Sequence, residues 1–188
     1  NPGLYWVIGY DINHIGQTLY HRLFSPGLGD GANFRIIRDE KTDQWRSYNP
    51  NTDRERYSES ELSPPMIGEH MIDPKTWHFE SRAGNVFRSV RLLNGATICA
   101  YPSTGDSPKK GDAVDGIWID EDIDKGSFLK EWQDRLATND GWFLWSVWPQ
   151  VANEALVKTL ERGEREKDNP DRAIEVFRLI SQDNQYSD

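Results

Sequence analysis

Short apolar runs alternate with polar stretches along the chain, and their lengths and periods predict strands and helices. The run 4–10 predicts a first strand, and a helix is expected to follow it from about residue 13 to residue 24. A short strand is expected at 34–38. Beyond it the chain is polar and has no sustained apolar period, so residues 39–76 are expected to form an exposed excursion with a few short strands or turns.

The remainder of the chain predicts a more regular alternation. Strand-like runs at 85–93 and 96–101 flank Asn94-Gly95, the dipeptide most typical of a tight β-hairpin turn. The later segments are predicted as strand, helix, strand, helix and strand, at 116–119, 128–137, 142–148, 151–165 and 174–180. Strands alternating with helices favour an α/β fold whose sheet is parallel at least in part, in a single domain over residues 1–188.

Composition narrows the class of protein. The net charge of −9 argues against a broad nucleic-acid footprint, although a local basic patch remains compatible with it. A single cysteine, Cys99, excludes an intrachain disulfide framework and a multi-cysteine zinc site, and the four histidines show no metal-ligand spacing. No apolar run approaches the roughly 20 residues that span a bilayer, so no membrane partner is expected. The chain opens on Asn1 without a Met, and both ends are expected to be cut from something larger.

The strongest chemical signal is a buried-type strand, Gly116–Ile119, that ends in the adjacent carboxylates Asp120 and Glu121. Strand side chains alternate between faces, so one carboxylate can hold a hydrated Mg²⁺ while the other polarises a water. This is the Walker B arrangement of phosphate-hydrolysing motors. No G-x-x-x-x-G-K-[ST] phosphate loop occurs in the sequence, and the nearest segment, 105–111, has Pro and Lys in unsuitable places.

Three other interpretations of the acidic segment stay open. It could be a solvated strand end. It could be a calcium loop, because Asp120, Asp122, Asp124 and Glu131 have EF-hand spacing, but Lys125 stands where that loop needs glycine. It could also be a metal nuclease, although neighbouring carboxylates on one short segment make a poor two-metal cage.

Several ordered segments carry a family resemblance. They are Leu62–Pro65, Val90–Ile98, Gly111 with Val114–Glu121, Trp132–Gly141, Leu144–Pro149 and Asp183-Asn184. In this order and spacing the chain resembles the ATPase domain of the large terminase subunit of tailed bacteriophages, the motor that packs double-stranded DNA into procapsids. It departs from the family at Trp148, where a Thr or Asn commonly precedes the proline, and it contains neither the Walker A segment nor the nuclease domain.

The resemblance implies a partial P-loop NTPase-type sheet flanked by helices, with a β-hairpin-rich insertion. It implies that Asp120 organises Mg²⁺ and that the catalytic Glu121 activates the attacking water. A coupling segment that senses the nucleotide would contain Ser146, Trp148, Pro149 and Gln150. The candidates for a basic finger that reaches a neighbouring subunit's phosphates are Lys109, Lys110 and Arg135.

The expected function is therefore part of an ATP-hydrolysing motor, with ATP and Mg²⁺ as cofactors of the full-length protein. The implied partners are double-stranded DNA, the portal protein, the small terminase subunit and further copies of the chain in a ring. The implied location is the host cytoplasm, transiently at the procapsid. Since nothing in the 188 residues cradles phosphates, this chain alone is expected to be inactive. The alternative is a non-catalytic module that kept the sheet, lost the nucleotide site and binds portal or capsid proteins.

Overall fold

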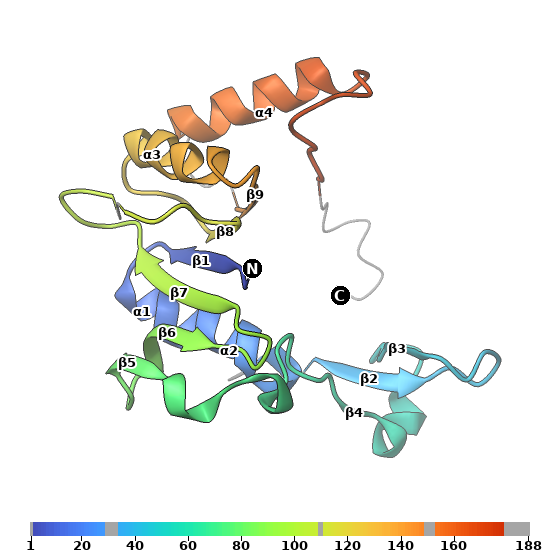
Figure 1. Cartoon of the computed structure of the whole chain (residues 1–188). Helices are drawn as coiled ribbons and strands as arrows, with labels where there is room; N and C mark the ends of the chain where they lie inside the picture. Colours follow the sequence, from blue (N-terminus) through green and yellow to red (C-terminus); the bar gives the residue numbers. More distant parts are fainter. Residues whose placement is uncertain (1, 29–33, 109–110, 149–152, 179–188) are drawn as a thin grey trace.

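The computed structural model describes residues 2–28, 34–108, 111–148 and 153–178. Its centre is a six-stranded sheet in the order β5-β6-β7-β1-β8-β9, flanked by helices (Figure 1). The strands are β1 (Leu4–Gly9), β5 (His78–Ser81), β6 (Val86–Arg91), β7 (Thr97–Pro102), β8 (Gly116–Asp120) and β9 (Trp142–Ser146). Strands β7, β1, β8 and β9 run parallel to one another. Strand β6 pairs antiparallel with β7, and β5 pairs antiparallel with β6. The predicted α/β class is confirmed, and the sheet is mixed.

The predicted hairpin joins β6 to β7 through Asn94-Gly95. Gly95 has φ +90°, a left-handed conformation that glycine adopts without steric cost. The Asn94 side-chain oxygen accepts from the Ala96 backbone N–H at 3.0 Å, which closes the turn. A Cβ on Gly95 would also come within 2.9 Å of Pro2, so the turn fits closely beside the start of the chain.

One face of the sheet is covered by a continuous helix over residues 12–24. It consists of α1 (Ile12–His14), a π-helical segment η1 (Ile15–Leu19) and α2 (Tyr20–Phe24). Asp11 caps its start by accepting from the His14 backbone N–H at 2.8 Å. The core that it forms with β1, β6 and β7 contains Val7, Ile15, Leu19, Leu23, Phe24, Phe87, Val90 and Ile98. The helix confirms the sequence-based prediction, but nothing in the apolar period predicted its π-helical segment.

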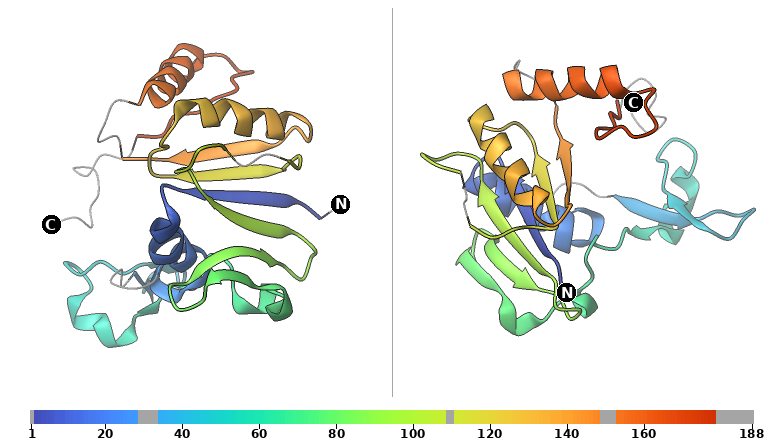
Figure 2. Two further views of the ribbon diagram at one scale, coloured as in Figure 1. Left: turned by 90° about the vertical axis from the view of Figure 1, so that its left-hand side faces the viewer. Right: turned by 45° about the horizontal axis from the view of Figure 1, so that its top comes forward.

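The opposite face carries α3 (Gly126–Ala137), with α4 (Glu154–Glu166) outside it (Figure 2). Leu129, Trp132 and Leu136 of α3 are buried, as the sequence pattern predicted. The core between α3 and the sheet contains Trp6, Ile8, Val114, Ile117, Ile119, Ile123, Phe128, Leu129, Trp132 and Leu136. Both faces of the parallel region near β1 are therefore covered, as parallel sheets require.

The predicted strand at 34–38 and part of the predicted excursion form a small sheet that projects from the main body (Figure 1). Its strands, in the spatial order β3-β2-β4, are β2 (Arg35–Arg38), β3 (Trp45–Ser47) and β4 (Glu61–Leu62). It is more than an exposed loop, because the nearly buried Asp53 accepts from two nitrogens of Arg46 at 2.6 and 2.7 Å. The remaining short helical turns are η2 (Pro26–Leu28), η3 (Arg54–Glu59), η4 (Glu69–Met71) and η5 (Pro74–Thr76).

The last strand predicted from the sequence, 174–180, does not form over its described residues 174–178. This segment packs beside α4 instead, so closely that a Cβ on Gly163 would lie 2.5 Å from Val176. Its apolar residues are thus used against a helix rather than in a sheet. Among the residues described, no helix has the length and apolar character needed to cross a membrane.

Candidate functional site

The candidate site lies where the parallel strands β1, β8 and β9 end. The side chains of β8 alternate between the two faces, so that Ile117 and Ile119 pack toward α3. Asp120, the last residue of β8, lies on the other face and is only 2% exposed. A solvated strand end is therefore not what the structure contains at this position.

Three side chains surround the Asp120 carboxylate. The Arg22 Nη1 donates to both oxygens, at 2.8 Å to Oδ1 and 3.0 Å to Oδ2. Ser146 Oγ, at the end of the neighbouring strand β9, donates to Oδ1 at 2.6 Å. His14 Nε2 lies 2.9 Å from Oδ2 and donates in the tautomer with hydrogen on that nitrogen. These four contacts fill the roughly four lone-pair positions that a carboxylate offers.

The π-helical segment explains how His14 and Arg22 reach the same carboxylate. In an α-helix two residues eight apart lie about 80° apart around the axis, because each residue turns by about 100°. A π-helical turn takes up about one extra residue, so the separation approaches two full turns. Segment η1 lies between the two side chains and places both on the face that looks toward Asp120. Such π-helical insertions occur frequently at functional sites.

The environment keeps Asp120 ionised. Burial by itself raises the pKa of this carboxyl, but the hydrogen bonds from His14 and Ser146 and the charge of Arg22 outweigh it, and the net pKa is lowered. Ser146 is held in turn by the Trp118 indole N–H, which donates to its Oγ at 2.8 Å. A chain of side chains from β8 and β9 therefore fixes the carboxylate.

Glu121 differs from its neighbour in every respect. It is half-buried, and its backbone has φ +70°, an uncommon conformation for a residue other than Gly, Asn or Asp. Two bonds to β9 hold it there: its N–H donates to the Ser146 carbonyl at 2.8 Å, and its carbonyl accepts from the Trp145 indole at 2.8 Å. Within the described part of the chain its carboxylate accepts no hydrogen bond. Glu121 therefore combines a strained backbone, a feature that clusters at functional sites, with a carboxylate that no described residue binds.

The donor set around Asp120 does not fit direct ligation of Mg²⁺ in this arrangement. Mg²⁺ is held by one or two carboxylates together with waters and phosphate oxygens, which needs an open lone pair on the carboxylate. All four positions on Asp120 are in use. Among the described residues, no group of three or more His, Cys, Asp or Glu side chains is arranged to hold a metal ion.

The remaining predicted site residues are dispersed. Trp148 follows β9 and is 62% exposed. Arg135 lies on α3, where it is paired with Glu131 and donates to the Gly111 carbonyl at 3.0 Å. Four other residues predicted for the coupling segment and the basic finger lie outside the described residues: Pro149, Gln150, Lys109 and Lys110. Of the predicted set, the structure therefore brings together Asp120, Glu121 and Ser146.

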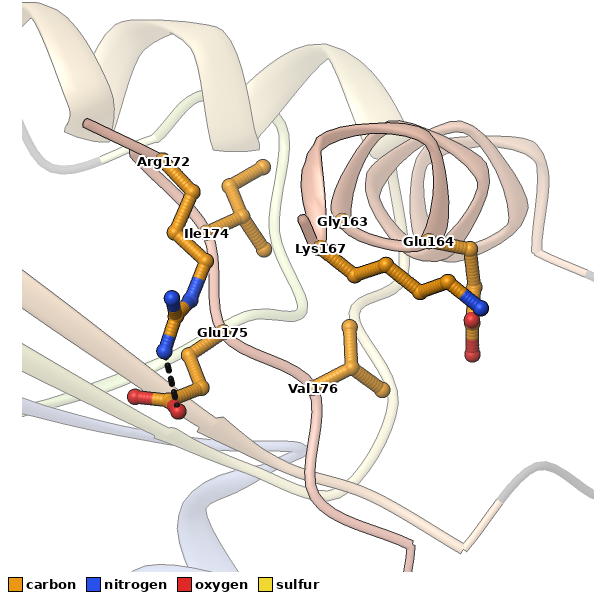
Figure 3. Close-up of a pocket in the computed structure, with 7 residues that line it drawn as sticks. All are labelled: Gly163, Glu164, Lys167, Arg172, Ile174, Glu175 and Val176. Atoms are coloured by element: carbon orange, nitrogen blue, oxygen red, sulfur yellow. Dashed lines mark hydrogen bonds and ion pairs between the residues drawn. The ribbon is translucent and has the colours of Figure 1, made fainter. Parts of the chain in front are cut away.

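A separate hollow of about 190 Å³ lies between α4 and the segment that follows it (Figure 3). Its lining is Gly163, Glu164, Lys167, Arg172, Ile174, Glu175 and Val176. Figure 3 shows the Arg172–Glu175 ion pair at its edge, with a contact of 2.8 Å. The hollow shares no residue with the Asp120 cluster, so it adds nothing to the candidate site.

An uncovered apolar area continues from the site along the sheet. On the face that carries α1 and α2, the register places Trp142 beside Gly116 and Leu144 beside Trp118. Trp142 and Leu144 are 54% and 53% exposed, and the Trp142 ring lies 6.3 Å from that of Tyr5. Strand β9 is the edge of the sheet. Among the residues that the structure describes, the covering of this face therefore stops short of β9.

No protein-family model matches the chain, and neither the curated proteins nor the solved structures contain a significant match.

Sequence reasoning missed both basic residues of the site. His14 and Arg22 lie 106 and 98 residues from Asp120 along the chain, and no metal-ligand or catalytic spacing marked them. The usable signal was indirect. A helix that follows a parallel strand starts at the carboxyl end of the sheet, which is also where Asp120 was expected.

Proposed function

We propose that the chain is part of an ATP-hydrolysing motor of the terminase type, in which Glu121 is the general base that activates the attacking water. The partners and the location proposed with it are those that the resemblance implies: double-stranded DNA, portal protein, the small terminase subunit, a ring of copies, and the host cytoplasm and procapsid. The carboxyl ends of parallel strands are where such sheets bind ligands.

The observation that carries the proposal is the contact between Asp120 and Ser146. A carboxylate at the end of one strand accepts from the hydroxyl at the end of the adjacent parallel strand at 2.6 Å. This joins the proposed Walker B segment to the proposed coupling segment at atomic contact. A change in the position of Ser146 would therefore alter its hydrogen bond to Asp120. It would also alter the backbone hydrogen bond between Ser146 and Glu121, the proposed base.

The uncovered edge of the sheet fits the part of the site that this sequence does not contain. Within the described part of the chain no strand pairs with the outer edge of β9, and Trp142 and Leu144 expose apolar surface on one face beside the Asp120 cluster. A strand and helix that carry a phosphate-binding loop would bury this surface and present backbone N–H groups at the carboxyl ends of the strands. We propose this edge as the place where such a segment packs.

The test uses a longer protein that contains a phosphate loop. Glu121→Ala should abolish ATP turnover and leave nucleotide binding intact, because the general base acts on the water and not on the nucleotide. Glu55→Ala, which changes an exposed acidic residue of the turn η3, is the matched control and should keep full turnover. Turnover that survives in Glu121→Ala would refute the role of this residue. Robust turnover by the 188 residues alone would refute the Walker assignment.

The saturated carboxylate of Asp120 favours one alternative, a non-catalytic module that binds portal or capsid proteins through the same sheet. A longer protein that contains the phosphate loop and binds no nucleotide would support this alternative.

A further inference from the structure

The two edge strands of the main sheet, β5 and β9, are built differently. Strand β5 carries the exposed Glu80, and its register with β6 shifts twice, so this edge is charged and irregular. Charge and irregularity are devices that keep an edge strand from pairing with another chain. Strand β9 has neither, because its sequence Trp-Phe-Leu-Trp-Ser contains no charged residue and no proline, and its register with β8 is unbroken. Among the described strands, β9 is therefore the edge that is open to another strand.

The outward backbone groups of β9 belong to Phe143 and Trp145. The Trp142 N–H and the Ser146 carbonyl bond to the residues that flank β8, at 3.2 and 2.8 Å, so these two residues turn their backbone groups toward β8. Successive residues of a strand turn their N–H and C=O groups to opposite sides. Phe143 and Trp145 therefore present two N–H and two C=O groups away from the sheet, and no described strand bonds to them.

These four groups match a second copy of the same strand. In an antiparallel pair with a two-fold axis at Leu144, Phe143 lies opposite Trp145 of the other copy. Residues in such a hydrogen-bonded pair exchange both of their backbone bonds. The axis generates the same pair twice, so every outward N–H and C=O group of both strands is satisfied. The edge is thus complementary to itself without any change of backbone.

The side chains of β9 suit the same register. Leu144, which is half-exposed, meets its own copy in a non-hydrogen-bonded pair, the kind whose side chains lie closest. Phe143 lies beside Trp145 of the other copy on the face that carries α3, where both side chains are only partly buried. A two-fold axis brings like charges together wherever a charged residue lies on it. Since β9 carries no charge, this repulsion is absent at the axis.

We propose that the 188-residue chain forms a symmetric dimer in which β9 pairs antiparallel with β9 of a second copy, on an axis at Leu144. The two main sheets then join into one continuous sheet. The inference rests on the edge strand and needs no nucleotide chemistry. A phosphate-loop segment in a longer protein would occupy the same edge, so the two occupants exclude each other.

Sedimentation equilibrium over micromolar protein concentrations tests the dimer. The wild type should change reversibly from monomer to dimer, and more readily at high salt, because salt screens the repulsion between two chains of net charge −9. Leu144→Lys should weaken the association about 100-fold, because it places two ammonium groups opposite each other. Leu93→Lys, at an exposed leucine of the β6–β7 hairpin, is the matched control and should associate like the wild type.

Cross-linking tests the register, in a background where the single cysteine is replaced by Cys99→Ala. Leu144→Cys should form a disulfide-linked dimer on mild oxidation, because Cα atoms about 4.5 Å apart lie within the range that a disulfide spans. Trp142→Cys is the control on the same face and equally exposed. It should not cross-link, because the register separates it from its own copy by four residues along the strand, about 13 Å.

A monomer at every concentration and salt would overturn the proposal, and so would a dimer that Leu144→Lys leaves intact. Equal cross-linking of Trp142→Cys and Leu144→Cys would overturn it too. The cross-linking variants keep the test decisive if Leu144→Lys proves less stable in urea unfolding. Neither experiment measures ATP turnover, so failure of the proposed function appears separately, as turnover by Glu121→Ala.

Discussion

Replacing Glu121 with glycine should make the protein more stable while removing its proposed base. The left-handed conformation at φ +70° costs an ordinary L-residue about 1–2 kcal/mol. Glycine escapes this cost but loses about 0.5–1 kcal/mol through the greater freedom of its unfolded chain. Glu121→Gly should therefore raise the free energy of unfolding by up to about 1.5 kcal/mol, and Glu121→Ala, which keeps a Cβ, should give no such gain.

Urea unfolding of the two variants followed by tryptophan fluorescence measures this difference. A gain of 1 kcal/mol would also raise the melting temperature by about 2–4 °C in a chain of this length. Asp140→Gly is the control, because Asp140 also has positive φ (50°) but belongs to a residue type that tolerates this conformation, so its gain should be smaller. If Glu121→Gly were less stable than Glu121→Ala, the strain argument would be wrong. The expected pattern is that of a residue retained for function at a cost in stability.

Three further predictions test the packing and electrostatics of the fold. Hydrogen bonds from Arg46 lower the pKa of Asp53 to about 2 from 3.8. The ionised carboxylate therefore adds at most about 2 kcal/mol to the free energy of unfolding, a contribution that is complete above pH 3.8 and lost as the pH falls toward 2. Asp53→Asn should flatten this part of the curve of stability against pH. Trp132→Phe should cost less in urea unfolding than Trp145→Phe, because the buried Trp132 indole N–H has no partner among the described residues, whereas that of Trp145 binds a carbonyl. Gly16→Ala should destabilise by about 1–3 kcal/mol, because its Cβ would lie 2.1 Å from the Gly84 carbonyl oxygen; a cost below 0.5 kcal/mol would show that the helix can shift.

The elements that could be predicted from the sequence are those whose signals are local. The Asn94-Gly95 turn needs only its own two residues and the flanking strands, and the face of α3 is set by the spacing of Leu129, Trp132 and Leu136. Asp120 and Glu121 were found in the same way, at the end of an apolar run. The strand predicted at 174–180 shows the limit of local signals, because apolar residues in this segment pack against α4 over the part described.

The partners of the site depend on long-range placement. Arg22 and His14 reach Asp120 only because β1 lies between β7 and β8, so that the helix after β1 starts beside the end of β8. No local sequence pattern predicts that strand order. The π-helical segment is equally hidden, because the buried positions Ile15, Leu19 and Leu23 repeat every four residues, which an α-helical pattern also allows.

The side chains of Asp120 and Glu121 differ in their burial and their bonding partners, and this difference matters more than the alternation of side chains along the strand. Asp120 is buried and engaged by a basic helix, whereas Glu121 is held through its own backbone N–H and carbonyl and leaves its carboxylate unbound within the described structure. Two titratable groups in such different environments can take different chemical roles. A ligand that enters the site must compete with Arg22 for Asp120, but among the described residues it meets no such competitor at the Glu121 carboxylate. Among the described residues, the carboxylate of Asp120 is therefore occupied by Arg22, His14 and Ser146, whereas that of the proposed base is available to a ligand.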